Sequence, residues 1–246
     1  MSDVELPASS TRASQAGLGA VLVSVFGGVL AVIRKDLLVE WRARAQVVAL
    51  LGFAVVVLLL FSFAVGPDSM ALARHAGGYL WLALLLSSTL LLARSMQNEV
   101  ESGALEGLLL IPVPAASIFY GKALANTVLL VLVALVALPV DLAITGAQVV
   151  SPGVALAVLL LGSAGVAAPG TFYAALTARV AGRQLLLPLL LFPLIVPALL
   201  AAVKTTTLAM TGDPMNQVNS WLTLLLAFDL IYWSLCGLLF EKVIEA

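Results

Sequence analysis

Six long apolar runs are the feature that most constrains how this chain can fold. They cover residues 45–65, 78–96, 121–141, 153–178, 184–203 and 219–240. A helix needs about 20 mostly apolar residues to cross the hydrocarbon core of a bilayer, and each run is close to that length. Only 10% of the residues are charged, whereas soluble domains carry about 25%. The sequence therefore predicts an all-α membrane protein with six transmembrane helices.

The residues before the first run divide into two parts. Residues 1–17 are polar or small, and their acidic residues precede the first basic one, which is the wrong charge order for a secretory signal. We expect a disordered cytoplasmic tail there. Residues 18–44 join an apolar, glycine-containing half to a charged half that contains Trp41. This pattern predicts an interfacial helix, with a seventh span as the alternative, so that residues 18–246 form a single transmembrane domain.

The basic residues predict the orientation of the chain. Six spans place ten of the twelve Lys and Arg residues on the side that holds both termini. Such an excess is typical of cytoplasmic loops, so both termini are expected in the cytoplasm. The outer loops, residues 66–77, 142–152 and 204–218, are short, and we expect no extracellular domain.

The segment "EVESGALEGLLLIPVPAASIFYGK", residues 99–122, joins the second and third predicted spans. If residues 98–110 are helical, Glu99, Gly103 and Glu106 share one face and the leucines lie largely on another. Acids suit the basic surface of a soluble protein better than the anionic inner leaflet, which attracts Lys and Arg. We therefore expect a cytoplasmic helix that docks a partner protein and ends at the Pro-x-Pro turn. An amphipathic helix resting on the leaflet is the alternative.

Two predicted spans contain residues that interrupt helices. Proline removes a backbone donor, and in lipid the freed carbonyl group needs a protein partner. We therefore expect these spans inside a bundle or at a subunit interface. They are candidates for a mobile hinge, although a static bundle of kinked helices fits the same pattern. The residues concerned are Pro169 and Gly170 in one span, and Pro188, Pro193 and Pro197 in the next.

Asp229 is the acidic residue deepest within a predicted span. A carboxylate there is costly and usually faces a bundle interior or an aqueous path. It could form a polar contact along a substrate route. It could instead hold helices together as a protonated or hydrogen-bonded acid near the hydroxyl groups of Tyr232 and Ser234, which is the interpretation we favour. Asp141, by contrast, is expected at a solvated helix end.

Motifs for nucleotide binding and for hydrolysis are missing from the sequence. The pair Gly121-Lys122 is followed by alanine and lacks the upstream glycine of a phosphate-binding loop. A single histidine, His75, and a single cysteine, Cys236, argue against a metal or haem site within the chain, and Cys236 is expected to be an apolar packing residue. The chain is thus not expected to be an enzyme by itself, and another chain would supply the energy for any work that it does.

Five local patterns, in order, resemble the CcmB family, the haem exporter protein B of cytochrome c maturation and a permease of the ABC-2 exporter type. They are "VGPD" (65–68), "LARHAGGYLWLALLLSSTLLLAR" (72–94), the acidic segment 99–122 with its Pro-x-Pro turn, "APGTFYAALTA" (168–178) and "LPLLLFPLIVPALL" (187–200). The resemblance runs from about Phe26 to the last span. The extension before it is longer than the family pattern leads us to expect.

The resemblance implies a function and a set of partners. Members of this family are six-span permeases of the bacterial inner membrane that pair with a cytoplasmic ATPase, CcmA, and join CcmC and CcmD. The complex uses ATP bound by CcmA to help release the haem-loaded chaperone CcmE outside the cytoplasmic membrane, and we expect this chain to bind no cofactor directly and to need a second copy of itself. Docking of the ATPase through the loop between spans 2 and 3 maps onto Glu99, Glu101, Gly103, Leu105, Glu106 and Pro112.

Two alternatives fit the same residues. One is a permease of another ABC-2 exporter, for a lipid, a drug or a polysaccharide. The other is a structural subunit that anchors the ATPase and moves nothing.

Overall fold

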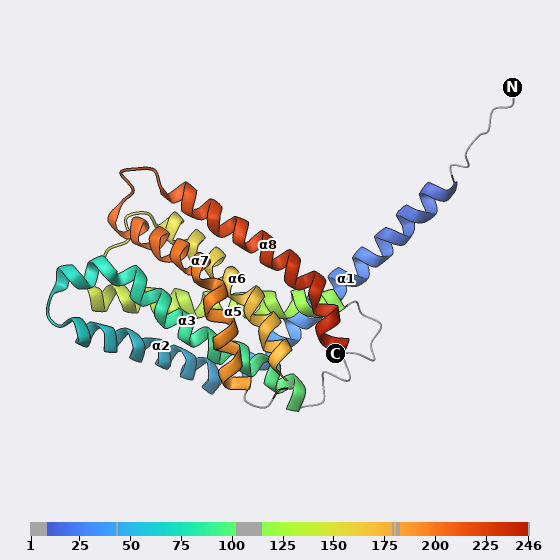
Figure 1. The fold of residues 1–246 in the computed structure, drawn as a ribbon, viewed down its shortest axis with the longest axis horizontal. Helices are drawn as coiled ribbons and strands as arrows, with labels where there is room; N and C mark the ends of the chain where they lie inside the picture. Colours follow the sequence, from blue (N-terminus) through green and yellow to red (C-terminus); the bar gives the residue numbers. More distant parts are fainter. Residues whose placement is uncertain (1–8, 43, 102–114, 179, 181–182, 246) are drawn as a thin grey trace, which may run out of the picture.

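The apolar runs form long helices in the computed structural model of the chain (Figure 1). The structure describes all residues except 1–8, 43, 102–114, 179, 181–182 and 246. Within these described ranges the chain forms helices and short connections, and no strand. The helices are α1 (Ser9–Arg42), α2 (Arg44–Val65), α3 (Ser69–Glu101), α5 (Ala115–Thr145), α6 (Pro152–Thr177), α7 (Arg183–Thr211) and α8 (Val218–Glu245).

Six of these helices are long and apolar enough to cross a membrane, which confirms the predicted number of spans. Their apolar stretches are Val47–Val65, Ser69–Gln97, Ala115–Thr145, Pro152–Thr177, Leu185–Thr211 and Val218–Val243. Most are longer than the predicted runs because the helices continue into polar sequence. At the start of α3, for example, the Asp68 carboxylate accepts hydrogen bonds from the backbone N–H groups of Met70 and Ala71, at 3.1 and 3.0 Å. This cap lets the helix begin nine residues before the apolar run.

The six spans pack side by side with alternating direction, so the bundle has two ends (Figure 1). One end, called the α1 end below, holds α1, the last turns of α3, the start of α5 and the C-terminus. The opposite end holds the short connections 66–68, 146–151 and 212–217. The N-terminal part of α1 projects away from the bundle, whereas its later part packs against α5.

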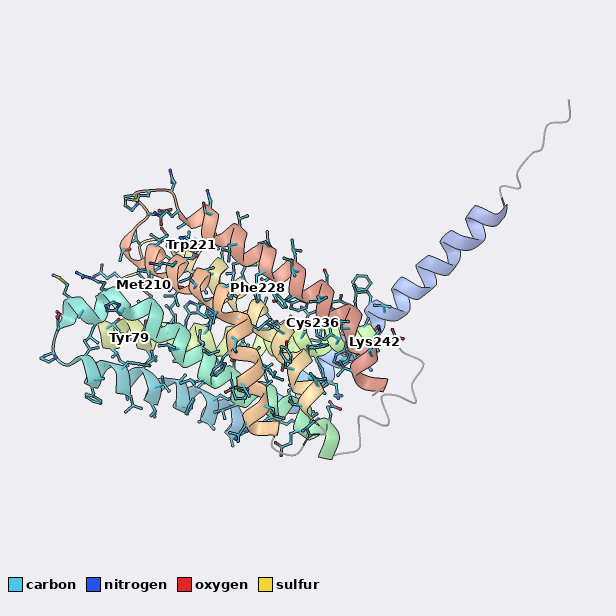
Figure 2. All side chains as sticks on the ribbon, viewed as in Figure 1. Tyr79, Met210, Trp221, Phe228, Cys236 and Lys242 are labelled. Atoms are coloured by element: carbon cyan, nitrogen blue, oxygen red, sulfur yellow. The ribbon has the colours of Figure 1, made fainter. Side chains whose placement is uncertain are left out.

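Helices α3 and α6 form the centre of the bundle. In each, 61% of the most apolar stretch is buried, against 22–33% in the other four spans. Glycines allow the two helices to approach closely, since a Cβ atom at Gly162 would lie 2.1 Å from the Trp81 ring and one at Gly170 would lie 2.4 Å from Leu92. Described side chains fill the spaces between the ribbons, and along α8 Phe228, Cys236 and Lys242 follow one another towards the α1 end (Figure 2). Cys236 is buried, as expected of a packing residue.

The N-terminal helix begins earlier in the sequence than predicted. Helix α1 begins at Ser9, so residues 9–17, expected to belong to a disordered tail, are helical, and only residues 1–8 of that tail lie outside the described residues. Helix α1 is not among the six helices that meet the length and apolarity needed for a span. The coupling helix predicted between the second and third spans falls largely on residues 102–114, outside the described residues.

Candidate functional site

Four charged side chains meet at the α1 end of the bundle. They are Lys35 and Asp36 on α1, Glu99 on α3 and Lys122 on α5, called the charged cluster below. Lys122 Nζ donates to Glu99 Oε1 at 2.9 Å and to Asp36 Oδ2 at 3.2 Å. Lys35 Nζ lies 3.4 Å from Asp36 Oδ1 and also donates to Glu99 Oε1. Each cation therefore contacts both carboxylates, and the ion pairs close into a ring.

The ring forms because α1 crosses α5 at a glycine. A Cβ atom at Gly121 would lie 2.6 Å from the Val32 Cβ atom, so only glycine allows this approach. On a helix, residues four apart share a face, which places Asp36 one turn beyond Val32 and next to Lys122. The pair Gly121-Lys122, which the sequence offers only as an incomplete nucleotide motif, is thus a packing residue followed by a buried cation.

Burial and charge pairing act in opposite directions on the groups of the cluster. Burial by itself would raise the pKa of Glu99, but the Lys122 ammonium and the hydrogen bonds from Lys35 and Lys122 outweigh it and hold this pKa below its ordinary value of 4.5. Burial likewise opposes the charge of Lys35, yet Glu99 and Asp36 raise the pKa of Lys35 above 10.5. Charge pairing therefore favours the charged forms of Glu99 and Lys35, and the ring contains as many basic side chains as acidic ones.

Glu40 lies one turn beyond Asp36 on the same face of α1. Its side chain is buried, and Oε1 has no hydrogen-bond partner in the part of the chain that the structure describes. Burial raises the pKa of Glu40 above 4.5, and Asp36 adds to this effect, while the charge of Arg94 on α3 opposes it. The face of α1 that meets the bundle thus carries Val32, the two residues of the charged cluster and Glu40.

The predicted docking residues lie next to the charged cluster or outside the described residues. The side chain of Glu99 is only 7% exposed and is turned into the cluster. The sequence suggests a free surface for Glu99, and the structure differs from this prediction. Glu101 is the last residue of α3. Gly103, Leu105, Glu106 and Pro112 fall outside the described residues. Sequence reasoning missed Lys35, Asp36 and Lys122 as a structural unit, although a lysine at the edge of an apolar run was a signal that it needs acidic partners.

Two carboxylic acids are buried within the spans. Asp229 on α8 is 6% exposed, and its Oδ1 would lie 2.8 Å from a Cβ atom at Gly165 on α6. Neither of its oxygens has a hydrogen-bond partner among the described residues, which include the hydroxyl groups of Tyr232 and Ser234. Asp141 on α5 is fully buried, with no partner for either oxygen in the same described part of the chain. The expectation that Asp141 is a solvated helix end is wrong, because it faces the bundle.

The predicted hinge residues occupy two different settings. Pro169 and Gly170 are buried in the central helix α6. In α7 all three prolines lie inside one continuous helix, where Pro188 is half-buried while Pro193 and Pro197 are exposed in the single chain. The expected burial of proline-containing spans thus holds for α6, and α7 presents two of its prolines on the outside of the bundle.

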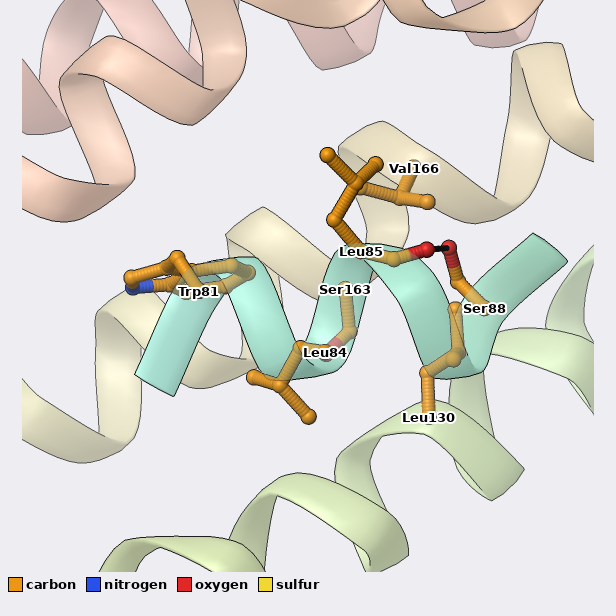
Figure 3. Close-up of a pocket in the computed structure, with 7 residues that line it drawn as sticks. All are labelled: Trp81, Leu84, Leu85, Ser88, Leu130, Ser163 and Val166. Atoms are coloured by element: carbon orange, nitrogen blue, oxygen red, sulfur yellow. Dashed lines mark hydrogen bonds between the residues drawn. The ribbon is translucent and has the colours of Figure 1, made fainter. Parts of the chain in front are cut away.

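Two cavities differ in size and position. A cavity of about 10 Å³ lies between α3, α5 and α6, room for about one water molecule, and is lined by Trp81, Leu84, Leu85, Ser88, Leu130, Ser163 and Val166 (Figure 3). There the Ser88 hydroxyl donates to the Leu85 carbonyl oxygen at 2.7 Å. A more open cavity of about 300 Å³ lies at the opposite end from the charged cluster, lined by Met70, Ala73, Arg74, Gly146, Ala147, Gln148, Met210 and Thr211. Only the second reaches the lower bound for small-molecule pockets, about 300 Å³.

Comparison with known proteins adds a family to this geometry. Residues 28–244 match the model of a family described as CcmB protein. The heme exporter protein B of Rhodobacter capsulatus is 36% identical over 170 residues, which are 69% of this chain and 78% of that protein. The protein of the same name from Paracoccus denitrificans is 34% identical over 193 residues, 76% of this chain and 87% of the relative. In Pseudomonas aeruginosa the identity is 32% over 190 residues, 77% and 85% of the two chains. The matched range of the family model contains the whole charged cluster.

Proposed function

This chain belongs to the CcmB protein family, and on that premise we propose that it is the permease subunit of an ABC transporter complex in cytochrome c maturation. It would couple ATP hydrolysis by a separate ATPase subunit to haem delivery, or to release of the haem-loaded chaperone, outside the cytoplasmic membrane. The name heme exporter protein B, carried by its relatives, supports a role in haem export. Haem would be handled by the complex, with CcmC, CcmD and CcmE as partners of this chain and CcmA as the ATPase.

The observation that carries the coupling role is the position of the charged cluster. Glu99 precedes segment 102–114 by three residues and Lys122 follows it by eight, and both belong to the same ring of ion pairs. A force on this segment would therefore act on α3, α5 and α1 together. We place the docking surface for the ATPase on this segment and on the last residue of α3, with Glu101, Gly103, Leu105, Glu106 and Pro112 as its residues.

The charges at the α1 end support a cytoplasmic position for that end. Arg34, Arg42 and Arg44 are exposed there, as are Arg94 and Lys242. Cations of this density are typical of the cytoplasmic side of a membrane protein. Both termini and the ATPase would then lie in the cytoplasm, and the 300 Å³ cavity would open outside.

The docking role is tested by charge reversal in the complex. Glu101→Lys and Glu106→Lys together should reduce co-purification of the ATPase subunit with the tagged chain, and its stimulated ATP turnover, because basic groups on the partner would meet cations. Glu241→Lys is the matched control, since Glu241 is exposed at the same end of the bundle but lies on α8. Thermal melting in detergent checks that all variants fold. An ATPase that remains bound and active with both reversals would rule out this docking surface.

A second candidate function is a structural anchor that holds the ATPase beside the haem-handling subunits and moves nothing. The size of the cavity between α3, α5 and α6 is consistent with it, because a space of about 10 Å³ is too small for a porphyrin. Distances between labelled spans, measured with trapped nucleotide and without nucleotide, separate the two functions. Unchanged distances would favour the anchor. Changed distances, with loss of haem-loaded chaperone release when the spans are cross-linked, would favour the transporting subunit. Release of a lipid, a drug or a polysaccharide instead would identify a different ABC-2 exporter.

A further inference from the structure

The charged cluster joins α1 to the end of α3 and to the first turns of α5, the two helices that flank segment 102–114. Helices rise about 1.5 Å per residue, so Glu99 lies about 3 Å along α3 from its last residue, Glu101. Lys122 lies about 10 Å along α5 from its first residue, Ala115. Both ends of segment 102–114 are thus tied to the same ring of ion pairs, and Lys35 and Asp36 tie α1 to that ring.

Because the cluster is buried, each of its charged side chains is stabilised mainly by the oppositely charged partners in the ring. The Lys122 side chain is 1% exposed, and those of Glu99 and Asp36 are 7% and 15% exposed. Removing one partner of a buried ion pair leaves an uncompensated charge, which is strongly destabilising. Lys35 is different because its side chain is 42% exposed and water can replace part of its contacts. Lys122 is therefore the member that holds the ring together.

Helix α1 is attached to the bundle mainly through this region. It packs against α5 and, less extensively, against α2, and the close approach at Gly121 lies one residue before Lys122. Its earlier part leaves the bundle (Figure 1), and Phe26 and Leu30 on α1 are 72% and 67% exposed. The position of a 34-residue helix, about 51 Å long, is thus set by contacts in its second half.

We propose that the charged cluster is a latch that fixes α1 to the end of α3 and the start of α5, the two helices that flank segment 102–114, so that α1 moves as one body with these two helix ends. Lys122 is the positioning residue of the latch, and Asp36 is its attachment on α1. The movement rests on the proposed function, in which a partner ATPase acts on the segment. The latch itself does not, because its geometry belongs to this chain alone.

The test uses distances between α1 and the bundle. Spin labels at Phe26→Cys on α1 and Leu238→Cys on α8, both at exposed positions, are introduced with Cys236→Ser, since Cys236 is the only cysteine. The latch variant is Glu99→Gln with Lys122→Met, which removes one charge of each sign and leaves the Lys35–Asp36 pair balanced. This keeps the bundle from burying an unpaired charge. The matched control is Lys242→Met, a change at an exposed lysine of the same end.

The chain alone tests the latch. We expect a narrow distance distribution between α1 and α8 in the unmodified and control proteins, and a broadened one in the latch variant while the bundle still melts cooperatively. Lys35→Met, which removes the exposed cation, should broaden the distribution less than the latch variant does. A latch variant with the narrow distribution of the unmodified protein would overturn the proposal.

The complex with the ATPase tests the movement. Trapping nucleotide should shift the α1–α8 distance in the unmodified protein and in Lys242→Met, and this shift should be lost in the latch variant although the ATPase still co-purifies. A latch variant that keeps the full shift would overturn the proposal even if the ATPase binds as expected. Absence of ATPase binding by the unmodified chain is a different result, because it removes the proposed function and the movement while the distances in the chain alone still report on the attachment of α1.

Discussion

Replacing Gly162 by alanine tests how tightly the two central helices pack. A Cβ atom at this position would lie 2.1 Å from Trp81 Cη2, and 2.8 and 2.9 Å from Cζ2 and Cζ3 of the same ring. Trp81 is 2% exposed, so its rigid ring has little space to move into. To reach an ordinary contact of 3.4 Å, α6 and the ring must move apart by about 1.3 Å. A well-packed core rarely accommodates a shift of this size without strain.

The position of the Trp81 ring is also fixed by a hydrogen bond. Its Nε1–H group donates to the Thr206 hydroxyl oxygen on α7 at 2.8 Å, and Thr206 is itself buried. A displacement of about 1.3 Å would break this bond. Overpacking costs about 1–3 kcal/mol, and the lost hydrogen bond costs about 1 kcal/mol more. We therefore expect Gly162→Ala to lower the free energy of unfolding by about 2–4 kcal/mol, before the helix propensity of alanine is counted.

The matched control is Gly52→Ala. Gly52 also lies in the interior of a helix, but a Cβ atom there would have nothing within 4 Å. Both variants gain up to about 1 kcal/mol because alanine favours a helix more than glycine does, so the difference between them isolates the clash with Trp81. Unfolding of the purified proteins by SDS titration in detergent, followed by tryptophan fluorescence, measures this difference. Two variants that agree within about 0.5 kcal/mol, the range of neutral surface changes, would refute the packing argument.

Three further outcomes follow from buried polar groups. Because the pKa of Glu40 is raised in the folded chain, ionisation of its carboxyl group above pH 4.5 opposes folding. Glu40→Gln should therefore raise the melting temperature at pH 7 and give no gain below about pH 4.5, and an equal gain at both pH values would contradict this. Asp229→Asn should fold with an unchanged or higher melting temperature, since its oxygens have no hydrogen-bond partner among the described residues; a clear drop would point to a partner that needs the carboxylate. Asn126→Ala removes the 2.9 Å hydrogen bond to the buried Thr171 hydroxyl and should lower the free energy of unfolding by about 1–3 kcal/mol, whereas an Asn126→Ala/Thr171→Val double variant should cost less than the sum of the two single changes.

The sequence could predict the number of spans because that property is local. Whether about 20 residues can cross a bilayer depends on their apolarity and on the rise of a helix. The apolarity and the length of each run can be read directly from the sequence, and the rise is the same for every α-helix. The ends of the helices were less predictable. Caps such as Asp68 extend α3 into polar sequence, and α1 begins at Ser9 where the composition suggested a tail.

The candidate site could be predicted only in part, for a different reason. Acidic residues before a Pro-x-Pro turn indicated a docking segment, but the partners of Glu99 could not be read from the segment. Lys35 and Glu99 are 64 residues apart in the sequence, and Lys122 and Asp36 are 86 residues apart. Their meeting depends on how α1 and α5 are rotated and on the close approach at Gly121.

The buried acid Asp141 shows the same difference between what the sequence predicts and what helix packing decides. Its place near the end of an apolar run suggested contact with solvent, and the tertiary structure turned it into the bundle. The apolarity of each run therefore determined that this chain forms membrane-spanning helices. Which face of each helix meets a neighbour, and so which charges are buried and with what partners, was decided only by the packing between helices, because that packing depends on side-chain shapes contributed by segments far apart in the chain.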